Sequence, residues 1–395
     1  MQDEELVKKA IESCKNNELS FCKFISANDS GETGGHQSGI YIPHNSFSIL
    51  FETPGIKGHN KDKFIEIRWQ DDDNTVTDSR FIYYGKRTRN EYRITRFGKG
   101  FSLLDEQSTG NLFVFVKLND NNYDAYMFSA DEDIETFLAA FGMSAADTNT
   151  LIQTSNIVRD REDVIMLFEE FIRTLEKDFP STGDIARKAR EIYQKANQKD
   201  NKKESIKTPD KVILKWIDTE YRLFKAIENH FYGDYVYKPF GTVDALVMAA
   251  NTILNRRKSR AGKSLEHHLR QVFDFNELRY SYQKITESNK TPDFIFPGIS
   301  YYFESKYKKN LVFLASKTTC KDRWRQILNE ADRIKTKHLF TLQQGISKNQ
   351  LDEMYKYNVV LVTPKEYISS FPGEYKEKIL PLNGFIEFTR GKTEI

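Results

Sequence analysis

The fold of the C-terminal half is decided by two apolar runs, Thr291-Pro292-Asp293-Phe294-Ile295-Phe296-Pro297 and Leu311-Val312-Phe313-Leu314-Ala315-Ser316-Lys317. Each run is short and almost continuously apolar, which is typical of a strand buried on both faces of a sheet. Asp293 stands at the start of the first run, and Lys317 ends the second. Two neighbouring strands of this kind bring a carboxylate and an ammonium group to one point of a sheet.

This arrangement is typical of Mg²⁺-dependent nucleases of the PD-(D/E)xK type. Their carboxylates hold the metal, because a hard cation prefers oxygen ligands. The metal polarises the phosphate and lowers the pKa of its bound water, and the lysine helps to orient or deprotonate that water. The usual pattern has an acid two residues before the lysine, whereas this chain has Ala315 there.

The missing acid can be supplied in two ways. Glu330 follows Lys317 on a predicted helix from Asp322 to Ile334, which returns a carboxylate to the metal. The competing candidate is Glu304-Ser305-Lys306, a literal ExK sequence. We prefer Lys317, because the run before it is apolar enough for the centre of a sheet, whereas the residues around Lys306 indicate an edge strand or a loop.

Ordinary structural roles are also open for these residues. A Pro-Asp pair commonly begins a strand or a turn, and a lysine after an apolar run is often only a solvated strand end. Glu330 could pair with Arg333 or Arg325 on its own helix. The residue pattern alone does not choose between these roles and catalysis.

Donor-rich segments lie on both sides of these runs. Lys321-Asp322-Arg323 suits G·C pairs, because Lys and Arg bond guanine and Asp accepts from cytosine, although a charged helix start is also an ordinary cap. The run from Arg256 to Lys263, which contains Arg260, has five basic residues and no acid, as expected for phosphate contacts. Glu266 opens the next predicted helix and is either a further acid of the metal site or a first-turn carboxylate.

The N-terminal part predicts a different architecture. From Phe21 to about Ala130, short β-branched and aromatic runs alternate with turn clusters, which favours a barrel or a sandwich. Between Lys86 and Lys99 the basic residues alternate with aromatic ones, and Glu91 is the one acid. This segment is either a DNA-contacting hairpin or loop, or a solvated strand face.

Chain length and periodicity indicate two domains. A chain of 395 residues exceeds what one core usually organises. Small and polar residues at 144–153 separate the strand-like part from apolar residues at helical intervals in 164–175 and 213–231. The segment 197–210 offers almost nothing to bury and predicts an exposed loop.

Composition excludes several classes of protein. With 59 basic and 57 acidic side chains the net charge is only +2, so a nucleic acid must be bound by local patches. Cys14, Cys22 and Cys320 support neither a disulfide framework nor a cysteine zinc site. The start lacks a signal-peptide pattern and no apolar run reaches about 18 residues, so we expect a soluble, non-exported, cytoplasmic protein with no membrane association.

Around the candidate catalytic and DNA-binding residues, the chain resembles the EcoRII-type restriction endonucleases. The matching blocks occur in order and at about the family's spacing: Arg256 to Glu266, Thr291 to Phe294, Lys317 to Asp332, and His338 to Gln343. The resemblance implies a restriction-endonuclease-like α/β/α domain that cleaves double-stranded DNA with Mg²⁺ at short sites with flanking C·G pairs.

Carried over residue by residue, the resemblance favours Lys317 over Lys306. It implies a catalytic set of Glu266, Asp293, Lys317 and Glu330, in which Asp293 and Glu330 are the metal ligands. It implies DNA contacts in the catalytic domain from Lys321, Asp322, Arg323, Tyr221 and Arg260.

The N-terminal half also resembles that family, in residues 26–37 with Tyr41 and in residues 87–96. The resemblance implies an effector domain, a DNA-binding β-pseudobarrel like those of some plant transcription factors. It implies effector-DNA contacts from His36, Tyr41, Arg87, Arg89, Asn90, Glu91 and Arg93.

Some positions depart from the family pattern. Tyr92 stands where the family has a lysine, and Phe97 where it has a tryptophan. Tyr221 matches an aromatic residue associated with extruding the central bases, but the arginine expected four residues earlier is Ile217. Either change could alter effector affinity or central-base specificity.

The sequence therefore predicts a two-domain α+β chain: an effector pseudobarrel at 1–150, a linker with leading helices at 151–210, and a catalytic domain at 211–395. We expect an effector-stimulated type II restriction endonuclease. Cutting both strands of a symmetric site calls for two active sites, so we expect a homodimer through the C-terminal domain. The alternatives are a non-catalytic, sequence-specific DNA-binding protein and a repair or structure-specific nuclease.

Overall fold

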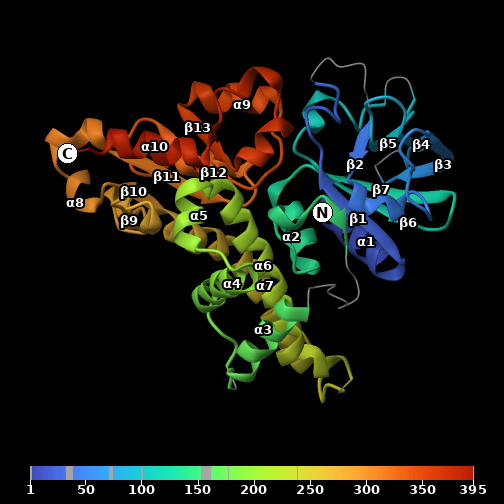
Figure 1. Cartoon of the computed structure of the whole chain (residues 1–395), viewed down its shortest axis with the longest axis horizontal. Coiled ribbons are helices and arrows are strands. Elements are labelled where there is room, and N and C mark those ends of the chain that lie inside the picture. Colours follow the sequence, from blue (N-terminus) through green and yellow to red (C-terminus); the bar gives the residue numbers. More distant parts are fainter. Residues whose placement is uncertain are drawn as a thin grey trace.

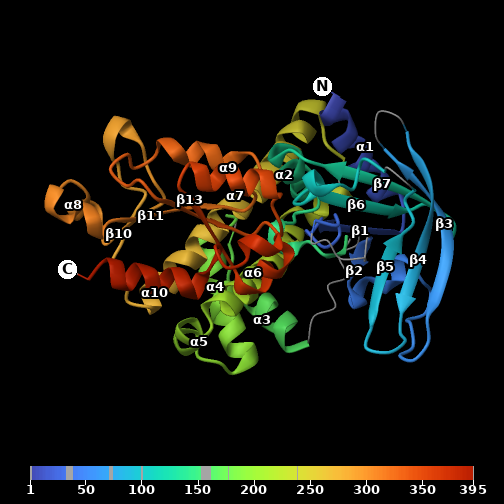
Figure 2. The same cartoon turned by 90° about the horizontal axis from the view of Figure 1, so that it is seen from above.

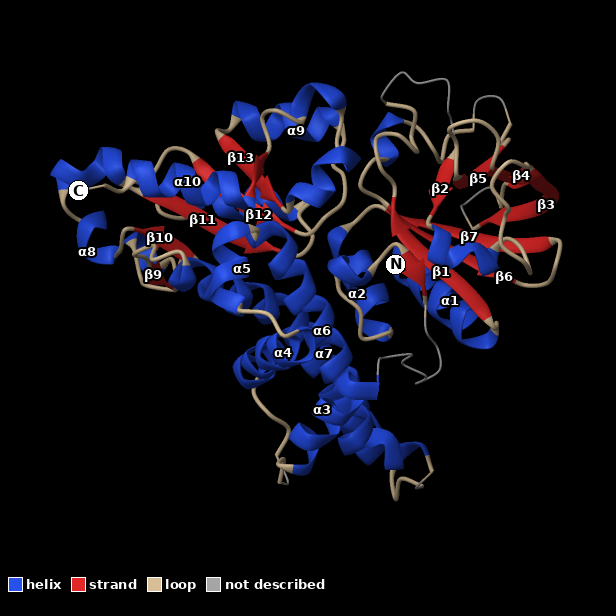
Figure 3. Cartoon of the chain, in the orientation of Figure 1, coloured by secondary structure: helices blue, strands red, loops and turns tan. Residues whose placement is uncertain are grey.

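The computed structural model describes residues 2–32, 39–70, 74–98, 101–152, 162–176, 178–237 and 239–394. In this part of the chain there are two β-sheets, one from each half of the sequence, with helices between and below them (Figure 1). Colouring by secondary structure separates the two groups of strands clearly (Figure 3). No helix of the described ranges is long and apolar enough to cross a membrane.

The N-terminal sheet has, within the described residues, eight strands in the order β2-β5-β4-β3-β7-β6-β1-β8. Its neighbours pair antiparallel, except for β3 and β7, which are parallel. The short strands predicted between Phe21 and about Ala130 are present, so that prediction is confirmed. The bounds are β1 Leu19–Phe24, β2 Ile40–Ile42, β3 Lys61–Trp69, β4 Val76–Tyr84, β5 Glu91–Thr95, β6 Leu112–Lys117, β7 Asn122–Phe128 and β8 Thr150–Leu151.

Both faces of this sheet are used for packing. One face encloses an aromatic core in which the ring of Tyr123 lies 5.0 Å from that of Phe81 and 4.8 Å from that of Phe115. The other face of β1, β6 and β7 packs against α1 (Gln2–Asn16) and α2 (Asp131–Ala140). A sheet of many short strands around an aromatic interior agrees with the predicted pseudobarrel.

The middle of the chain is helical. Its helices are α3 Glu162–Arg173, α4 Thr182–Asn197, α5 Asn201–Lys207, α6 Pro209–Tyr232 and α7 Val243–Phe275. Of these, α3 and α6 coincide with the two segments of predicted helical periodicity. The 33 residues of α7 give it a length of about 50 Å. The basic run from Arg256 to Lys263 and Glu266 both lie inside this helix, so the prediction that Glu266 opens a helix is wrong.

The predicted exposed loop at 197–210 is also wrong, because the segment contains α5. Asp200 caps the helix by accepting the backbone N–H groups of Lys202 and Lys203. Asn201 is buried, and its side-chain oxygen accepts the indole N–H of Trp216 at 3.1 Å. A polar sequence is ordered here by capping and by a buried amide, not by apolar burial.

The C-terminal sheet has six strands within the described part of the chain, in the order β14-β13-β12-β11-β10-β9. The strand that ends at Lys317 lies inside the sheet, as predicted. It pairs antiparallel with β10 and parallel with β12. The bounds are β9 Ser281–Tyr282, β10 Phe294–Phe296, β11 Val312–Lys317, β12 Lys337–Thr341, β13 Val359–Thr363 and β14 Leu380–Pro381.

Helices cover both faces of this sheet. Phe294, Phe296 and Leu314 point to the face that packs against α6, α7 and α10 (Leu382–Lys392). Ile295 and Phe313 point to the opposite face, which packs against α8 (Ile299–Tyr302), α9 (Lys348–Lys356) and the segment around Trp324. The two-domain α+β fold with a C-terminal α/β/α domain is therefore confirmed.

Two local predictions for this domain fail. Residues 322–334 do not form an α-helix: a 3-10 segment runs from Arg323 to Asn329, and Glu330 is extended. Residues 301–309 form no strand, because α8 is followed by a 3-10 segment from Ser305 to Asn310. The loop half of that prediction is right, and the Lys306 side chain is 66% exposed beside Glu304 at 3.1 Å.

Candidate active site and DNA-binding surfaces

Asp293 and Lys317 are brought together by the pairing of β10 with β11. Phe294 lies opposite Leu314, which sets Asp293 beside the end of β11. Asp293 Oδ2 accepts the backbone N–H of Ser316 at 2.8 Å and its hydroxyl at 3.2 Å. Ser316 therefore fixes the orientation of the carboxylate next to Lys317. The sequence interpretation did not single out Ser316.

Glu330 reaches the same region from the end of the 3-10 segment. The ammonium group of Lys337, a buried residue, donates to the backbone carbonyls of Glu330 and Ala331 and so holds this turn in place. Burial and the nearby charge of Asp293 raise the pKa of Glu330 to about 7, and Lys317 acts in the opposite direction. Burial also raises the pKa of Asp293, opposed by the Ser316 hydrogen bonds and by Lys317.

Glu266 on α7 faces the same charges. Its Oε2 accepts the hydroxyl of Tyr282 at 2.5 Å and the amide of Gln283 at 3.0 Å. Burial raises the pKa of Glu266, the Tyr282 hydrogen bond lowers it, Asp293 raises it, and Lys317 lowers it. The structure thus brings Glu266, Asp293, Lys317 and Glu330 within electrostatic reach of one another.

The carboxylates of this site offer the oxygen ligands that a hard metal ion prefers. No three His, Cys, Asp or Glu side chains of the described residues form a cluster that could hold a metal ion by themselves. The pair Asp293 and Glu330 nevertheless has the right chemistry, since both offer hard oxygen ligands and Asp293 disfavours the charge of Glu330. A divalent cation between them would relieve this repulsion.

A cavity of about 200 Å³ opens between the two domains at this point. The C-terminal domain lines it with residues that include Glu266, Ser316 and Lys317, and the N-terminal domain lines it with residues that include Glu135 and Ser144. Seen from above, α2 lies between the two sheets (Figure 2). The N-terminal domain therefore covers the side of the active site that holds Lys317.

The predicted base-reading segment is engaged by the same helix. The carboxylate of Asp131, at the start of α2, accepts the backbone N–H groups of Lys321, Asp322 and Arg323 at 3.1, 2.9 and 3.0 Å. The guanidinium of Arg323 lies 2.5 Å from Glu135. The ammonium of Lys321 bonds the side chain of Asn111 in the N-terminal domain.

Burial of this contact disfavours its charges. Burial and the hydrogen bond with Asp322 raise the pKa of Asp131 to about 7. Burial lowers the pKa of Lys321 to about 8. The contact around Asp131 is therefore polar, and its burial disfavours the charged forms of Asp131 and Lys321.

The basic run of α7 contacts the N-terminal domain through Arg260. Arg260 is 1% exposed, donates to the carbonyl of Gly142 at 3.2 Å and lies 3.6 Å from the carboxylate of Asp147. Its guanidinium lies 5.3 Å above the ring of Tyr221. Ile217 is buried in the apolar core, so it does not present a side chain to DNA in this arrangement.

The loop between β4 and β5 carries most of the remaining predicted DNA contacts. Arg87, Arg89 and Asn90 are exposed between β4 and β5, and the Arg89 guanidinium lies 5.0 Å from the ring of Tyr84. His36 lies outside the described residues.

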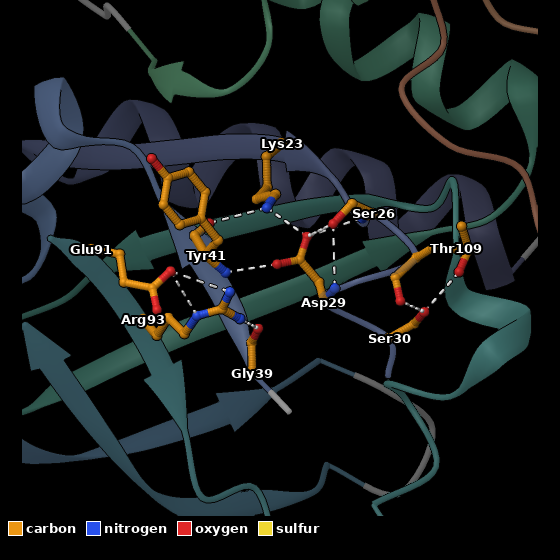
Figure 4. Close-up of polar contacts among 10 residues, drawn as sticks. Lys23, Ser26, Asp29, Ser30, Gly39, Tyr41, Glu91, Arg93 and Thr109 are labelled. Atoms are coloured by element: carbon orange, nitrogen blue, oxygen red, sulfur yellow. Dashed lines mark hydrogen bonds and ion pairs between the residues drawn. The ribbon is translucent and has the colours of Figure 1, made fainter. Parts of the chain in front are cut away.

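Two of the predicted contacts are tied into the sheet (Figure 4). Arg93 is only 4% exposed, donates to the carbonyl of Gly39 at 2.9 Å and lies 3.4 Å from Glu91. Tyr41 is half-buried, and its backbone N–H donates to Asp29 at 2.7 Å. In this arrangement Arg93 is placed to position Gly39 and Glu91, whereas Arg87 and Arg89 are exposed. The Asn90 side chain accepts the hydroxyl of Tyr83 at 2.6 Å.

A buried ion pair near these contacts was missed at the sequence level. Lys23 Nζ lies 2.6 Å from Asp29 Oδ2, and the two side chains are 4% and 0% exposed. Asp29 also accepts from the hydroxyl of Ser26, and Lys23 donates to the carbonyl of Tyr41 (Figure 4). The signal was a single lysine in the apolar strand run Phe21 to Ile25, which requires a buried partner.

Comparison with protein families gives two matches. A model described as EcoRII C terminal matches residues 224–386, and a model described as restriction endonuclease EcoRII, N-terminal, matches residues 14–147. The Type II restriction enzyme EcoRII of Escherichia coli is 36% identical over 394 residues, covering 95% of each chain. The Type II restriction enzyme SsoII of Shigella sonnei is 30% identical over 120 residues, covering 28% of this chain and 39% of that protein.

Similar solved structures are complexes with DNA. Metal-depleted Ecl18kI in complex with uncleaved, modified DNA is 20% identical, with a TM-score of 0.44, and the match covers 59% of this chain and 84% of that one. The PspGI–substrate DNA complex is 15% identical, with a TM-score of 0.43, and the match covers 56% of this chain and 96% of that one.

The buried Lys23–Asp29 pair leads to a stability prediction. Asp29→Asn leaves the Lys23 charge buried without its partner, and we expect the free energy of unfolding of the N-terminal domain to fall by about 3–5 kcal/mol. Urea titration followed by aromatic fluorescence measures the loss. Asp62→Asn, which breaks the partly exposed Arg80–Asp62 pair, is the control and should change stability by less than about 1 kcal/mol. Equal losses in the two variants would contradict the prediction.

Proposed function

The chain belongs to the EcoRII family of type II restriction enzymes, and on this basis we propose that it is a sequence-specific endonuclease that hydrolyses phosphodiesters in double-stranded DNA. One observation carries the proposal for this site. Asp293, Lys317 and Glu330 approach one another where β11 ends and β10 begins. A nuclease of the PD-(D/E)xK type needs these groups at this place.

We assign Asp293 and Glu330 as the ligands of a divalent cation, which we take to be Mg²⁺. When bound, the cation supplies Lewis acidity to the scissile phosphate. Lys317 is assigned to stabilise the charge that develops on the phosphate and to orient the attacking water. Ser316 holds Asp293 by two hydrogen bonds, and Glu266, held by Tyr282, completes the set as a further acid.

We assign Lys321, Asp322 and Arg323 to the reading of flanking C·G pairs. Their position four to six residues after Lys317 supports this role, because it keeps base contacts close to the reacting phosphate. Arg260 and Tyr221 are assigned to DNA contacts nearby. All five residues serve these roles only after α2 and the loop that follows it have moved away.

The N-terminal domain is proposed to bind a second copy of the DNA site and to control the first. Its contacts are assigned to Tyr41, Arg87, Arg89, Asn90 and Glu91, with Arg93 as a positioning residue and His36 as a further contact. In the absence of effector DNA, α2 occupies the donors of the catalytic domain that DNA requires. Effector binding then releases this contact, which is a coupling free energy between two DNA sites.

We further propose domain bounds, a homodimer and a cellular location for the chain. We divide the chain into an effector domain at 1–150, leading helices at 151–210 and a catalytic domain at 211–395, which accords with the end of the first sheet at Leu151 and the start of α6 at Pro209. A homodimer through the C-terminal domain supplies the two active sites that two strands require. As part of a restriction–modification system the enzyme acts in the cytoplasm, where its DNA substrate lies.

Plasmid cleavage with Mg²⁺ tests the catalytic assignment. Asp293→Ala, Lys317→Ala and Glu330→Ala should each reduce the cleavage rate by about 10² or more while binding of the same DNA persists. Lys306→Ala is the matched control and should leave the rate almost unchanged, because Lys306 is exposed beside Glu304. Loss of cleavage in Lys306→Ala with activity retained in Lys317→Ala would reverse the assignment.

The same assay separates the alternative functions. Discrete fragments from the intact chain indicate a site-specific endonuclease, and their ends give the recognition site. Retained sequence-specific binding without any cleavage would instead indicate the non-catalytic DNA-binding protein. Nicking without sequence preference would indicate a repair or structure-specific nuclease.

The control exerted by α2 leads to a second prediction. Glu135→Ala removes the partner of Arg323, and we expect cleavage of a single-site plasmid to rise about 2–5-fold, since a partly exposed ion pair contributes up to about 1 kcal/mol. Stimulation by an added duplex that contains the mapped site should fall by the same factor. Glu132→Ala, an exposed acid of the same helix turn, is the control and should behave like the intact chain.

The raised pKa of Asp131 predicts a pH dependence of this control. The covered arrangement binds a proton on Asp131 that the open one does not, so it is favoured below about pH 7 and loses this advantage as the pH rises through that value. The lowered pKa of Lys321 acts the other way, but only above about pH 8. Stimulation by effector duplex should therefore be larger at about pH 6 than at about pH 7.5.

Asp131→Asn supplies the check, because an amide does not titrate. The ratio of rates with and without effector duplex cancels the pH dependence of the chemical step. In the variant this ratio should be flat between the two pH values. The same slope in Asp131→Asn as in the intact chain would show that another group is responsible.

A further inference from the structure

The carboxylate of Glu266 is held through one of its two oxygens. Oε2 accepts the hydroxyl of Tyr282 at 2.5 Å and the side-chain amide of Gln283 at 3.0 Å. Among the described residues, no donor of the protein reaches Oε1. The same side chain lines the cavity between the domains, together with Ser316 and Lys317. The protein thus occupies one oxygen of this acid and leaves the other available beside the candidate active site.

Both donors come from the edge of the C-terminal sheet, whereas Glu266 comes from α7. In β9, Tyr282 lies opposite Phe294 of β10. Directly after β9, the backbone N–H of Gln283 donates to the backbone carbonyl of Asp293 at 3.0 Å. Gln283 therefore bonds the main chain of one acid and the side chain of another. Through this residue the start of β10 is linked directly to α7.

The ring of Tyr282 has its own contacts. Its centroid lies 5.6 Å from that of Phe294, and the guanidinium of Arg270 lies 4.5 Å from it, which is a favourable cation–aromatic distance. Arg270 follows Glu266 by four residues, so both side chains lie on one face of α7. The helix contacts Tyr282 at its ring and at its hydroxyl. Removal of the hydroxyl alone should therefore leave the ring in place.

A second tyrosine of the same segment makes the ordinary form of this contact. Tyr280 lies just before β9, and its hydroxyl donates to the carboxylate of Asp274 at 2.8 Å, again on α7. Asp274 is exposed, whereas Glu266 is partly buried and faces the charges of the candidate active site. The two tyrosines thus hold two acids of one helix, and Tyr282 holds the acid that the reaction can use.

We propose that Tyr282 and Gln283 are positioning residues of the nuclease reaction, which hold Glu266 against Asp293 with Oε1 free to accept a hydrogen bond from water at the reacting phosphate. The inference rests on the proposed function, because Glu266 acts only if this site cleaves DNA. A carboxylate only accepts hydrogen bonds, so the oxygen without a protein donor is the one that water approaches. An orientation that is set in advance raises the rate of the chemical step and adds nothing to the affinity for DNA.

Single-turnover cleavage of a plasmid with Mg²⁺ tests the role of Tyr282. Tyr282→Phe removes only the hydroxyl, and the rate should fall about tenfold or more while the Kd for the same DNA stays unchanged. Tyr280→Phe is the matched control: it takes a hydroxyl from another acid of the same helix and should cleave at the intact rate. An undiminished rate in Tyr282→Phe, a loss seen only as weaker DNA binding, or an equal loss in both variants would overturn the proposal.

Two replacements of Gln283 separate its hydrogen bond from its bulk. Gln283→Ala removes the amide donor and should slow cleavage at least about threefold. Gln283→Glu keeps the shape but sets a second carboxylate beside Glu266, so it should be slower still. Gln283 has a φ of 46°, and Ser288, exposed in the same connection between β9 and β10, has a φ of 56°. Ser288→Ala therefore controls for alanine at a positive φ and should leave the rate unchanged. A Gln283→Glu variant as fast as Gln283→Ala would contradict the assignment.

A double-mutant cycle shows whether Tyr282 acts through Glu266. In the Glu266→Gln background, Tyr282→Phe should have no further effect on the single-turnover rate, because the group that it positions is already changed. The full additional loss in the double variant would show that Tyr282 acts by another route, and the proposal would fail.

Failure of this inference differs from failure of the proposed function. If the intact chain cuts DNA at discrete sites and both Glu266→Gln and Tyr282→Phe keep the full rate, this inference is overturned and the assignment of Asp293, Lys317 and Glu330 stands. If the intact chain cuts no DNA with Mg²⁺, the proposed function is overturned, and this inference with it.

Discussion

The arrangement of the two domains depends on one buried carboxylate. Asp131 accepts the backbone N–H groups of Lys321, Asp322 and Arg323, which come directly after the catalytic strand β11. Such donors are left open at the start of a helical segment, and an acidic side chain satisfies them well. Around this contact one apolar cluster continues from the outer face of the N-terminal sheet through α2 and α6 to the C-terminal sheet. The polar contact therefore sets the register between two surfaces that apolar packing holds together.

The chemistry of this interface explains how covering the site and binding DNA exclude each other. Glu135 engages Arg323, Asn111 engages Lys321, and Gly142 with Asp147 engages Arg260. Each of these partners offers an oxygen acceptor to a donor that would otherwise meet a phosphate or a base edge. On the proposed assignment of DNA contacts, the N-terminal domain competes with DNA for the same donors.

Local sequence patterns predicted the strands whose own residues are apolar enough to be buried in a sheet. The continuous apolar run before Lys317 indicated an inner strand, and its neighbour at Asp293 followed from the same pattern. Other contacts escaped the sequence patterns because their partners are distant in sequence. The segment after Lys321 forms a 3-10 segment instead of an α-helix, and the N–H groups at its start are accepted by Asp131, 190 residues earlier in the chain. Arg260 is buried because Gly142 and Asp147 come from another domain. Lys23 is the exception, since a charge inside an apolar strand already indicates a buried partner.

The composition of α7 changes along its length in a way that periodicity alone does not reveal. Its first half is apolar on every side, its middle carries the basic run around Arg257 and Arg260, and its last third buries Leu265, Leu269 and Phe273 against the sheet while presenting Glu266 to the active site. A single helix behaves as a stiff rod over this distance. The Arg260 contact with the N-terminal domain and the Glu266 carboxylate therefore lie on one continuous helix. An uninterrupted helix of 33 residues thus joins the contact with the N-terminal domain to a carboxylate of the candidate active site.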